Sequence, residues 1–224
     1  ALARLYRSRL PSPEEVEDAA FDWGSDESCN IATISIYEYL DTQPFEVQAS
    51  SFDIAQGIRN LDLDGKEAVL ILIDSNGGSP AAAEEISRAI DEVEVPVVAF
   101  VRGAALSAGY WLASAADHII ALESASIGNI GITYSYLDEI ALNKIEGYTY
   151  QEIVSGEYKE VGRVDKPLTE KHKQYLEDLT NDTFLIFAET VMRNRNLSKE
   201  QFNLVADGKY YIAKKALELG LIDQ

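Results

Sequence analysis

The stretch Ala68-Val-Leu-Ile-Leu-Ile-Asp-Ser-Asn-Gly-Gly78 is the part of the sequence that decides the fold. It begins with an uninterrupted apolar run and ends in Asp74-Ser-Asn followed by a pair of glycines. A short apolar run bounded by a turn is typical of a strand that is buried on both faces of a parallel sheet. We therefore predict a buried strand over 68–74 with a glycine-rich turn at its carboxyl end.

Helices and further strands alternate on both sides of this strand. Pro80–Val93 starts with proline and is rich in helix formers, which predicts a crossover helix. Other strands are predicted at 31–36, 96–101, 118–122 and 130–134, and other helices at 52–61, 110–116 and 136–145. The alternation indicates an α/β fold with a parallel sheet.

The character of the chain changes at Thr169, where long helical patterns begin and where Thr169 is placed to cap the first of them. Shorter helices are expected from Ser198 and over Ala213–Leu219. We predict an N-terminal linker or arm over 1–30, a catalytic core over 31–168, and a helical C-terminal region of the same domain over 169–224.

Charge and composition exclude several classes of function. The 224 residues carry 19 Lys and Arg against 38 Asp and Glu, a net charge of −19 that repels nucleic acid and anionic lipid. No apolar run approaches the roughly 20 residues of a membrane span, so we expect a soluble chain. The basic stretch with Arg4, Arg7 and Arg9 is an exception at the start. Cys29, the sole cysteine, follows an acidic stretch and is poorly supported as a catalytic thiol.

A second glycine-rich turn, Gly103-Ala-Ala-Leu-Ser-Ala-Gly109, follows the strand predicted at 96–101. The carboxyl ends of parallel strands are where open sheets bind ligands, and amides of glycine turns can hold an oxyanion. Ser107 stands in this turn directly before a predicted helix. The local sequence alone favours an ordinary N-cap serine over a nucleophile.

A serine nucleophile needs a base, and the chain has only two histidines. His118 begins a predicted strand, and His172 lies in a charged helix face, so neither is a good base for Ser107. A lysine can act instead if burial lowers its pKa, because loss of water disfavours the ammonium form.

Several short motifs, in order, resemble one known family. They are Asp74-Ser-Asn-Gly-Gly78, Ala104-Ala-Leu-Ser-Ala-Gly-Tyr110, Ala115-Ala-Asp117, Gly128-Asn-Ile-Gly131, Ser155-Gly-Glu-Tyr-Lys159 and Ala206-Asp-Gly-Lys-Tyr-Tyr211. Together they are similar to the signal peptide peptidase A family of serine peptidases (family S49), which has the ClpP/crotonase fold of repeated β-β-α units with a parallel sheet. The resemblance runs from about Ile31 to Asp223.

The resemblance implies a catalytic role for five residues. Ser107 would be the nucleophile and Lys159 the base of a Ser-Lys dyad, while the backbone amides of Gly78 and Ala108 would form the oxyanion hole. Asn129 would orient the lysine. No metal, nucleotide or other cofactor is implied, and the substrates would be peptides, such as cleaved signal peptides or other hydrophobic peptides.

The sequence departs from the family pattern at three positions. Asn76 stands where proline is usual, Ala108 where glycine is usual, and Asn129 where a serine would orient the lysine. An amide oxygen can accept the same hydrogen bond as a serine hydroxyl. We therefore expect activity to survive these changes.

The resemblance also bears on partners and location. Short members of the family form ring-shaped homo-oligomers in which Ser and Lys of adjacent subunits meet, and members typically carry an N-terminal membrane anchor. We therefore expect a membrane-associated, extracytoplasmic enzyme, with the anchor upstream of Ala1.

Three alternatives remain open at this point. A phage-type or prophage relative of the same family would mature capsid or scaffold proteins in the cytoplasm. A crotonase-type hydratase or isomerase would act on acyl thioesters, although such enzymes usually have acidic residues near the second turn. A scaffold that uses the fold only for oligomerisation would need neither Ser107 nor Lys159.

Overall fold

The structure is a computed structural model that describes residues 30–43 and 49–224. The predicted N-terminal arm, including Arg4, Arg7, Arg9 and Cys29, lies outside the described residues apart from Asn30. The chain divides into two compact units. The first contains the described residues up to Gly131 together with Phe187–Gln224, and the second is Ile132–Ile186. The predicted boundary between 168 and 169 was drawn on sequence character and stays a prediction.

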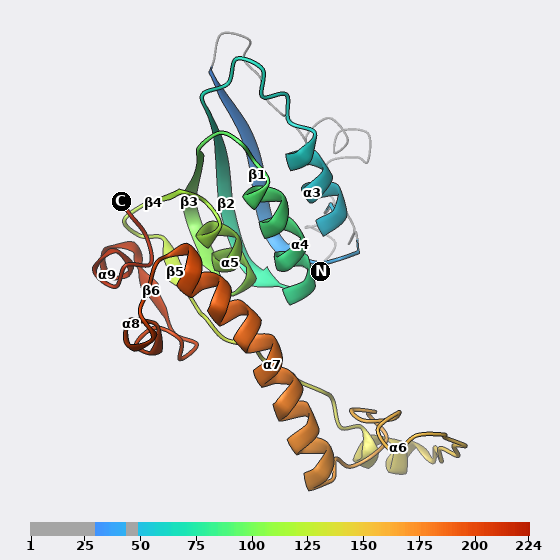
Figure 1. The fold of residues 1–224 in the computed structure, drawn as a ribbon. Helices are drawn as coiled ribbons and strands as arrows, with labels where there is room; N and C mark the ends of the chain where they lie inside the picture. The colour runs from blue at the N-terminus through green and yellow to red at the C-terminus, as the bar shows by residue number, and fades with distance from the viewer. Residues whose placement is uncertain (1–29, 44–48) are drawn as a thin grey trace, which may run out of the picture. The chain divides into compact units, whose positions relative to one another are not determined.

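A six-stranded, mostly parallel sheet forms the centre of the first unit, and it confirms the predicted α/β class (Figure 1). One edge of β3 pairs with β2, and its other edge pairs first with β4 and then with β5. The final strand, β6, is antiparallel to β5. The strands are β1 (Ile31–Leu40), β2 (Ala68–Gly78), β3 (Val97–Leu106), β4 (His118–Ala121), β5 (Ser126–Gly128) and β6 (Tyr210–Ile212).

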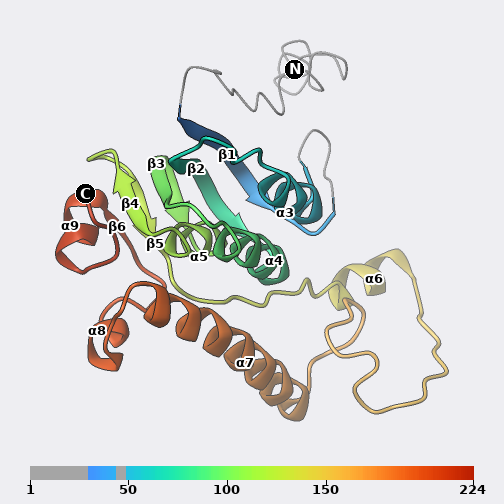
Figure 2. The same cartoon turned by 45° about the horizontal axis from the view of Figure 1, so that its top comes forward.

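Three helices cover one face of this sheet, as Figures 1 and 2 show from two directions. They are α3 (Ser51–Arg59), α4 (Pro80–Asp91) and α5 (Ala108–Ser114). Alternate strand residues are fully buried, among them Ile71, Ile73 and Val101. This alternation arises because successive side chains of a strand point to opposite faces.

The C-terminal segment closes the core around α5. The buried Tyr110 hydroxyl donates a hydrogen bond to the carbonyl of Leu221 over 2.8 Å. Trp111 stacks on Phe187, with 4.8 Å between ring centroids and an interplanar angle of 5°. These contacts attach the end of the chain to the helix that follows Ser107. The short helices α8 (Lys199–Asn203) and α9 (Ala213–Glu218) lie in the same segment.

The second unit contains α6 (Ile140–Glu146) and the first part of α7 (Glu170–Asn194). Gly147 ends α6 in a left-handed conformation, with φ of 78°. The predicted cap of α7 is confirmed, because the Thr169 hydroxyl accepts a hydrogen bond from the amide of His172. None of the helices in residues 30–43 and 49–224 has the length and apolar character needed to cross a membrane.

Two predicted elements differ from the structure. The strand predicted at 130–134 is wrong, because pairing with β3 occurs earlier, at Ser126–Gly128. Gly128 and Asn129 both have positive φ, of 108° and 54°, and this conformation ends the strand before Ile130. The helix predicted at 136–145 begins only at Ile140.

Candidate active site

Ser107 occupies a sharp, strained turn between β3 and α5. Its φ of 52° and ψ of −122° lie where residues with a side chain are rarely found. Three backbone hydrogen bonds hold it there: its amide donates to Gly128 over 2.8 Å, and its carbonyl accepts from Tyr110 and Trp111, each over 3.0 Å. Such strain is of order 1–3 kcal/mol and persists only where the surroundings enforce it. A strand-to-helix turn of this kind is the local arrangement that exposes a nucleophilic serine.

The alternative role of Ser107 as an ordinary helix cap fails on its own geometry. Ser50 and Ser198 show what capping looks like in this chain: both are extended, with φ of −68° and −66°, and their hydroxyls accept from the amides of Asp53 and Gln201. Ser107 makes no such side-chain bond to α5. Its half-buried hydroxyl is therefore not occupied in capping the helix.

The two glycine-rich turns meet at Ser107. A Cβ atom on Gly77 would lie 2.8 Å from the Cβ of Ser107, 2.9 Å from the carbonyl oxygen of Leu106 and 3.2 Å from the amide nitrogen of Ala108. Gly77 also has φ of 108°, which glycine adopts without steric cost. Only glycine lets the backbone of β2 come this close to the nucleophile turn.

Gly78 and Ala108, whose amides are predicted to form the oxyanion hole, lie at the end of β2 and at the start of α5. Ala108 is the first residue of α5, so its amide has no acceptor inside that helix. Gly78 is the last residue of β2 and pairs with Leu40 of β1, where any Cβ would overlap the Leu40 backbone. Ala108, which stands where the family pattern has glycine, is only 4% exposed and so packs into the core.

Asn129 lies next to Gly128, whose carbonyl oxygen accepts the hydrogen bond from the Ser107 amide. Its own amide donates to the carbonyl of Lys209 over 2.7 Å, and its side-chain Nδ2 donates to the carbonyl of Gly208 over 2.6 Å. The side-chain nitrogen of Asn129 is thus engaged, and its side-chain oxygen, Oδ1, is the atom that can accept a hydrogen bond. Four of the five predicted site residues, all except Lys159, thus gather at the carboxyl ends of β2, β3 and β5.

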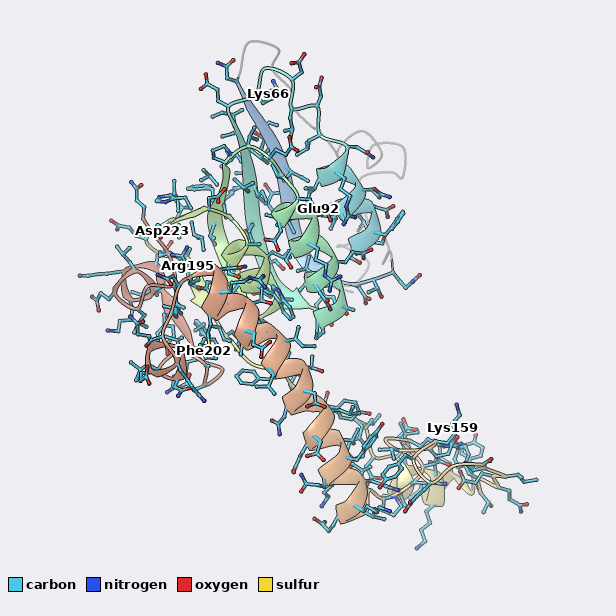
Figure 3. All side chains as sticks on the ribbon, viewed as in Figure 1. Lys66, Glu92, Lys159, Arg195, Phe202 and Asp223 are labelled. Atoms are coloured by element: carbon cyan, nitrogen blue, oxygen red, sulfur yellow. The ribbon has the colours of Figure 1, made fainter. Side chains whose placement is uncertain are left out.

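Lys159 belongs to the second unit and is exposed (Figure 3). It lies in a turn in which its amide donates to the carbonyl of Gly156 over 3.2 Å. Ser107 belongs to the first unit, so the pairing of the two residues stays a prediction.

The position of His118 excludes it as the base for Ser107. It pairs with Val98, near the start of β3, whereas Ser107 follows the end of that strand. Leu106 lies eight positions after Val98 in this strand, or about 26 Å away at the usual rise per residue. His172 belongs to the second unit, where its ring packs against Tyr158 with 5.8 Å between centroids.

Two residues that support the turns were missed at the sequence level. The Asp74 carboxylate accepts a hydrogen bond from the amide of Ala104 over 3.0 Å, and the buried Ser75 hydroxyl accepts from Gly77 over 3.2 Å. A Cβ on Gly109 would lie 2.8 Å from the Ser75 carbonyl oxygen. Small and polar residues directly after an apolar strand were the available signal for this role.

Two models of known protein families match the chain. Residues 89–224 match the model of Peptidase family S49, and residues 43–128 match that of Clp protease. A putative protease of Methanocaldococcus jannaschii is 32% identical over 163 residues, which are 72% of this chain and 52% of the relative. A putative signal peptide peptidase SppA of Enterococcus faecium is 27% identical, over 70% of this chain and 47% of the relative.

A third relative comes from a virus. The capsid assembly protease C of Escherichia phage lambda is 28% identical over 160 residues, covering 70% of this chain and 36% of the relative. The chain spans about half the length of the first two relatives and about a third of the phage protein.

Proposed function

Because the chain belongs to peptidase family S49, we propose that it is the catalytic part of a serine peptidase in which Ser107 is the nucleophile and Lys159 the general base. The observation that carries the proposal is the strained turn at Ser107, with φ of 52° and a hydroxyl that does not cap α5. Strain at a residue with a nucleophilic side chain, beside a glycine that allows close backbone approach, is characteristic of a functional site.

The proposed reaction is acyl transfer. Neutral Lys159 Nζ takes the proton from Ser107 Oγ, and Oγ forms a bond to the substrate carbonyl carbon. The amides of Gly78 and Ala108 stabilise the resulting oxyanion. The carbon–nitrogen bond then breaks, and the leaving amine takes a proton from the Lys159 ammonium. Water, deprotonated by the same lysine, attacks the acyl carbon, and the bond from this carbon to Ser107 Oγ breaks. Oγ takes its proton from the Lys159 ammonium, which releases the acid and restores Ser107 and the neutral lysine.

The base must be neutral to accept a proton, and this requirement bears on the assembly. Removal from water disfavours the ammonium form of a lysine. Lys159 is exposed in the single chain. We therefore propose a ring-shaped homo-oligomer in which a neighbouring subunit covers Lys159 and supplies the Ser107 with which it reacts.

Exposed apolar side chains in the second unit support this assembly. Leu142, Ile145 and Ile153 are 50%, 84% and 106% exposed. Large exposed apolar residues gathered in one region are typical of surfaces that become buried in a protein–protein interface. Asn129 supports the site in another way, since its Oδ1 is available to orient an incoming ammonium or amine.

The proposed substrates are hydrophobic peptides such as cleaved signal peptides, as the name of the Enterococcus faecium relative suggests. With such substrates the enzyme would work at a membrane, on its extracytoplasmic side. The phage lambda relative favours a second candidate, the maturation of capsid or scaffold proteins in the cytoplasm. The two candidates are separated by comparing cleavage of a panel of signal peptides, which the first predicts, with cleavage of folded assembly proteins, which the second predicts.

A serine-directed fluorophosphonate tests the chemistry directly. We expect the wild type to be labelled at Ser107, Ser107→Ala to be unlabelled, and Lys159→Ala to lose about 100-fold or more in labelling and peptide hydrolysis, as for loss of a general base. Lys144→Ala, which removes another exposed lysine of the second unit, is the matched control and should behave as the wild type. Native mass measurement should show every variant with the same assembly.

Full activity of Lys159→Ala would show that Lys159 is not the general base. Absence of labelling in the wild type, together with tight coenzyme A binding, would favour an acyl-thioester enzyme over a peptidase.

A further inference from the structure

Side-chain contacts tie the turn that carries Lys159 to the second unit, both before and after the lysine in the chain. Its backbone forms a series of tight turns, in which the amides of Lys159 and Val161 donate to Gly156 and Tyr158. Turns of this kind hold the backbone only loosely unless side chains fix them. The side chains on either side of Lys159 therefore decide how well the lysine is placed.

The residues before Lys159 are fixed to α7. Glu157 accepts a hydrogen bond from Lys171 Nζ over 2.7 Å. The Tyr158 ring packs against Tyr175, with 4.8 Å between centroids, and against His172 at 5.8 Å. The Lys171 ammonium also lies 5.2 Å from the centre of the Tyr158 ring. The ion pair of Glu157 and the ring contacts of Tyr158 thus hold the chain directly ahead of the lysine.

The residues after Lys159 are fixed by one guanidinium group, that of Arg163. Arg163 Nη1 donates to Glu160 over 2.7 Å, and Nε and Nη2 bind both oxygens of Asp165 over 2.7 and 2.8 Å. The Asp165 side chain is only 3% exposed, so it is a firm anchor. Arg163 also lies 3.9 Å from Glu152 and 5.7 Å from the centre of the Tyr150 ring. Bidentate pairing of this sort adds geometric specificity to the ion pair.

Lys159 is the exception in this loop. Glu157, Tyr158 and Glu160 each contact another part of the second unit through their side chains, whereas within the described residues the Lys159 side chain has no such partner. The contacts thus hold its backbone and leave its amine available. This is the arrangement expected of a group that must be placed accurately and still react.

We propose that Arg163 is a positioning residue for Lys159: it fixes the turn that follows the lysine and keeps the neighbouring Glu160 carboxylate away from the lysine amine. The inference rests on the proposed function, in which Lys159 is the base. Without Arg163, Glu160 would be free to pair with Lys159. A nearby carboxylate favours the ammonium form and so raises the pKa of a lysine. Glu157 does not take this place because Lys171 holds it.

The test compares Arg163→Ala and Arg163→Lys in peptide hydrolysis across pH. We expect kcat of Arg163→Ala to fall about 10–100-fold, as for a catalytic group displaced by about 1 Å, with KM little changed. The rising limb of its pH profile should move to higher pH, because Glu160 then stabilises the protonated lysine. Arg163→Lys should recover part of the rate. The double variant Arg163→Ala/Glu160→Gln should lose the pH displacement while keeping the lower rate.

Arg88→Ala is the matched control. Arg88 is an exposed arginine of α4 that pairs with Glu84, so its loss removes a surface ion pair of the first unit, and we expect the wild-type rate and pH profile. If Arg163→Ala kept the wild-type rate and the wild-type pH profile, the inference would be overturned. It would also be overturned if the variant lost rate only because the oligomer was lost, with no shift of the pH profile. Full activity in Lys159→Ala would instead overturn the proposed function.

Discussion

Gly77→Ala is the substitution that tests most sharply whether the two glycine-rich turns form one site. The new methyl group would lie 2.8 Å from the Ser107 Cβ and 2.9 Å from the Leu106 carbonyl oxygen, distances at which something must shift. Both neighbours are held in place, Leu106 by its pairing with Gly128 and Ser107 by its three backbone hydrogen bonds. The displacement should therefore fall on the turn that bears the nucleophile.

The structure divides the expected cost into two parts. An alanine with positive φ costs about 1–2 kcal/mol in any setting, and overpacking a close contact adds about 1–3 kcal/mol. Gly65→Ala isolates the first part, because Gly65 has φ of 70° and no atom within 4 Å of the added Cβ. We therefore expect Gly65→Ala to lose about 1–2 kcal/mol of unfolding free energy and Gly77→Ala about 2–5 kcal/mol.

Urea unfolding measures the stability of each variant, and the rate of fluorophosphonate labelling measures the site. Gly65→Ala should be labelled at the wild-type rate, and Gly77→Ala should be labelled at least tenfold more slowly under conditions where it is folded. If Gly77→Ala were labelled at the wild-type rate and matched Gly65→Ala in stability, the close approach of Gly77 to Ser107 would be wrong.

Two further predictions concern strain and charge. Ser107→Gly and Ser107→Ala should both abolish labelling. In urea unfolding the glycine variant should be about 1 kcal/mol more stable than the alanine variant, because relief of strain of about 1–3 kcal/mol exceeds the entropic cost of glycine. Equal stability of the two variants would contradict strain at φ of 52°. Partial burial alone raises the pKa of Asp223, but hydrogen bonds from Arg195 and from the Ile119 amide outweigh burial, so the pKa is lowered overall. The contribution of Asp223 to folding stability is therefore present above its pKa in the unfolded chain and is lost as pH falls through its pKa in the folded protein. Thermal unfolding below about pH 4 should accordingly lose less stability in Asp223→Asn, measured against its own value at pH 7, than in the wild type (Figure 3 labels Asp223 and Arg195).

Local patterns predicted much of the fold. The apolar run at 68–73 and proline at the start of α4 carry signals that belong to a few neighbouring residues, and both elements formed where expected. The strand predicted at 130–134 failed because its β-branched and aromatic residues, in Ile130-Gly-Ile-Thr-Tyr134, give the same local signal whether or not a partner strand is available. Pairing with β3 had already ended at Gly128. Strand positions depend on distant partners, which a local pattern does not contain.

The candidate site was less accessible to local reasoning for a related reason. Ser107, Ser50 and Ser198 all stand directly before helices, and nothing in the residue type separates them. What separates them is the backbone: Ser107 is forced to positive φ by Gly128 on one side and by α5 on the other. Gly128 is 21 residues away in sequence, so the strain could be inferred only from the fold or from a resemblance to a family.

Lys159 raises the same difficulty in a stronger form. Its own surroundings, an exposed turn rich in glutamate, resemble those of any surface lysine. The features that distinguish it are the contacts of its neighbours, since Tyr158 packs against Tyr175 of α7 and Glu160 is bound by Arg163. Such an arrangement has no advantage for a lysine that serves only solubility, because ordering a surface turn costs conformational entropy that an exposed ion pair repays poorly. The fixed turn, around an amine that has no partner within the described residues, fits the reactive role that we propose for Lys159.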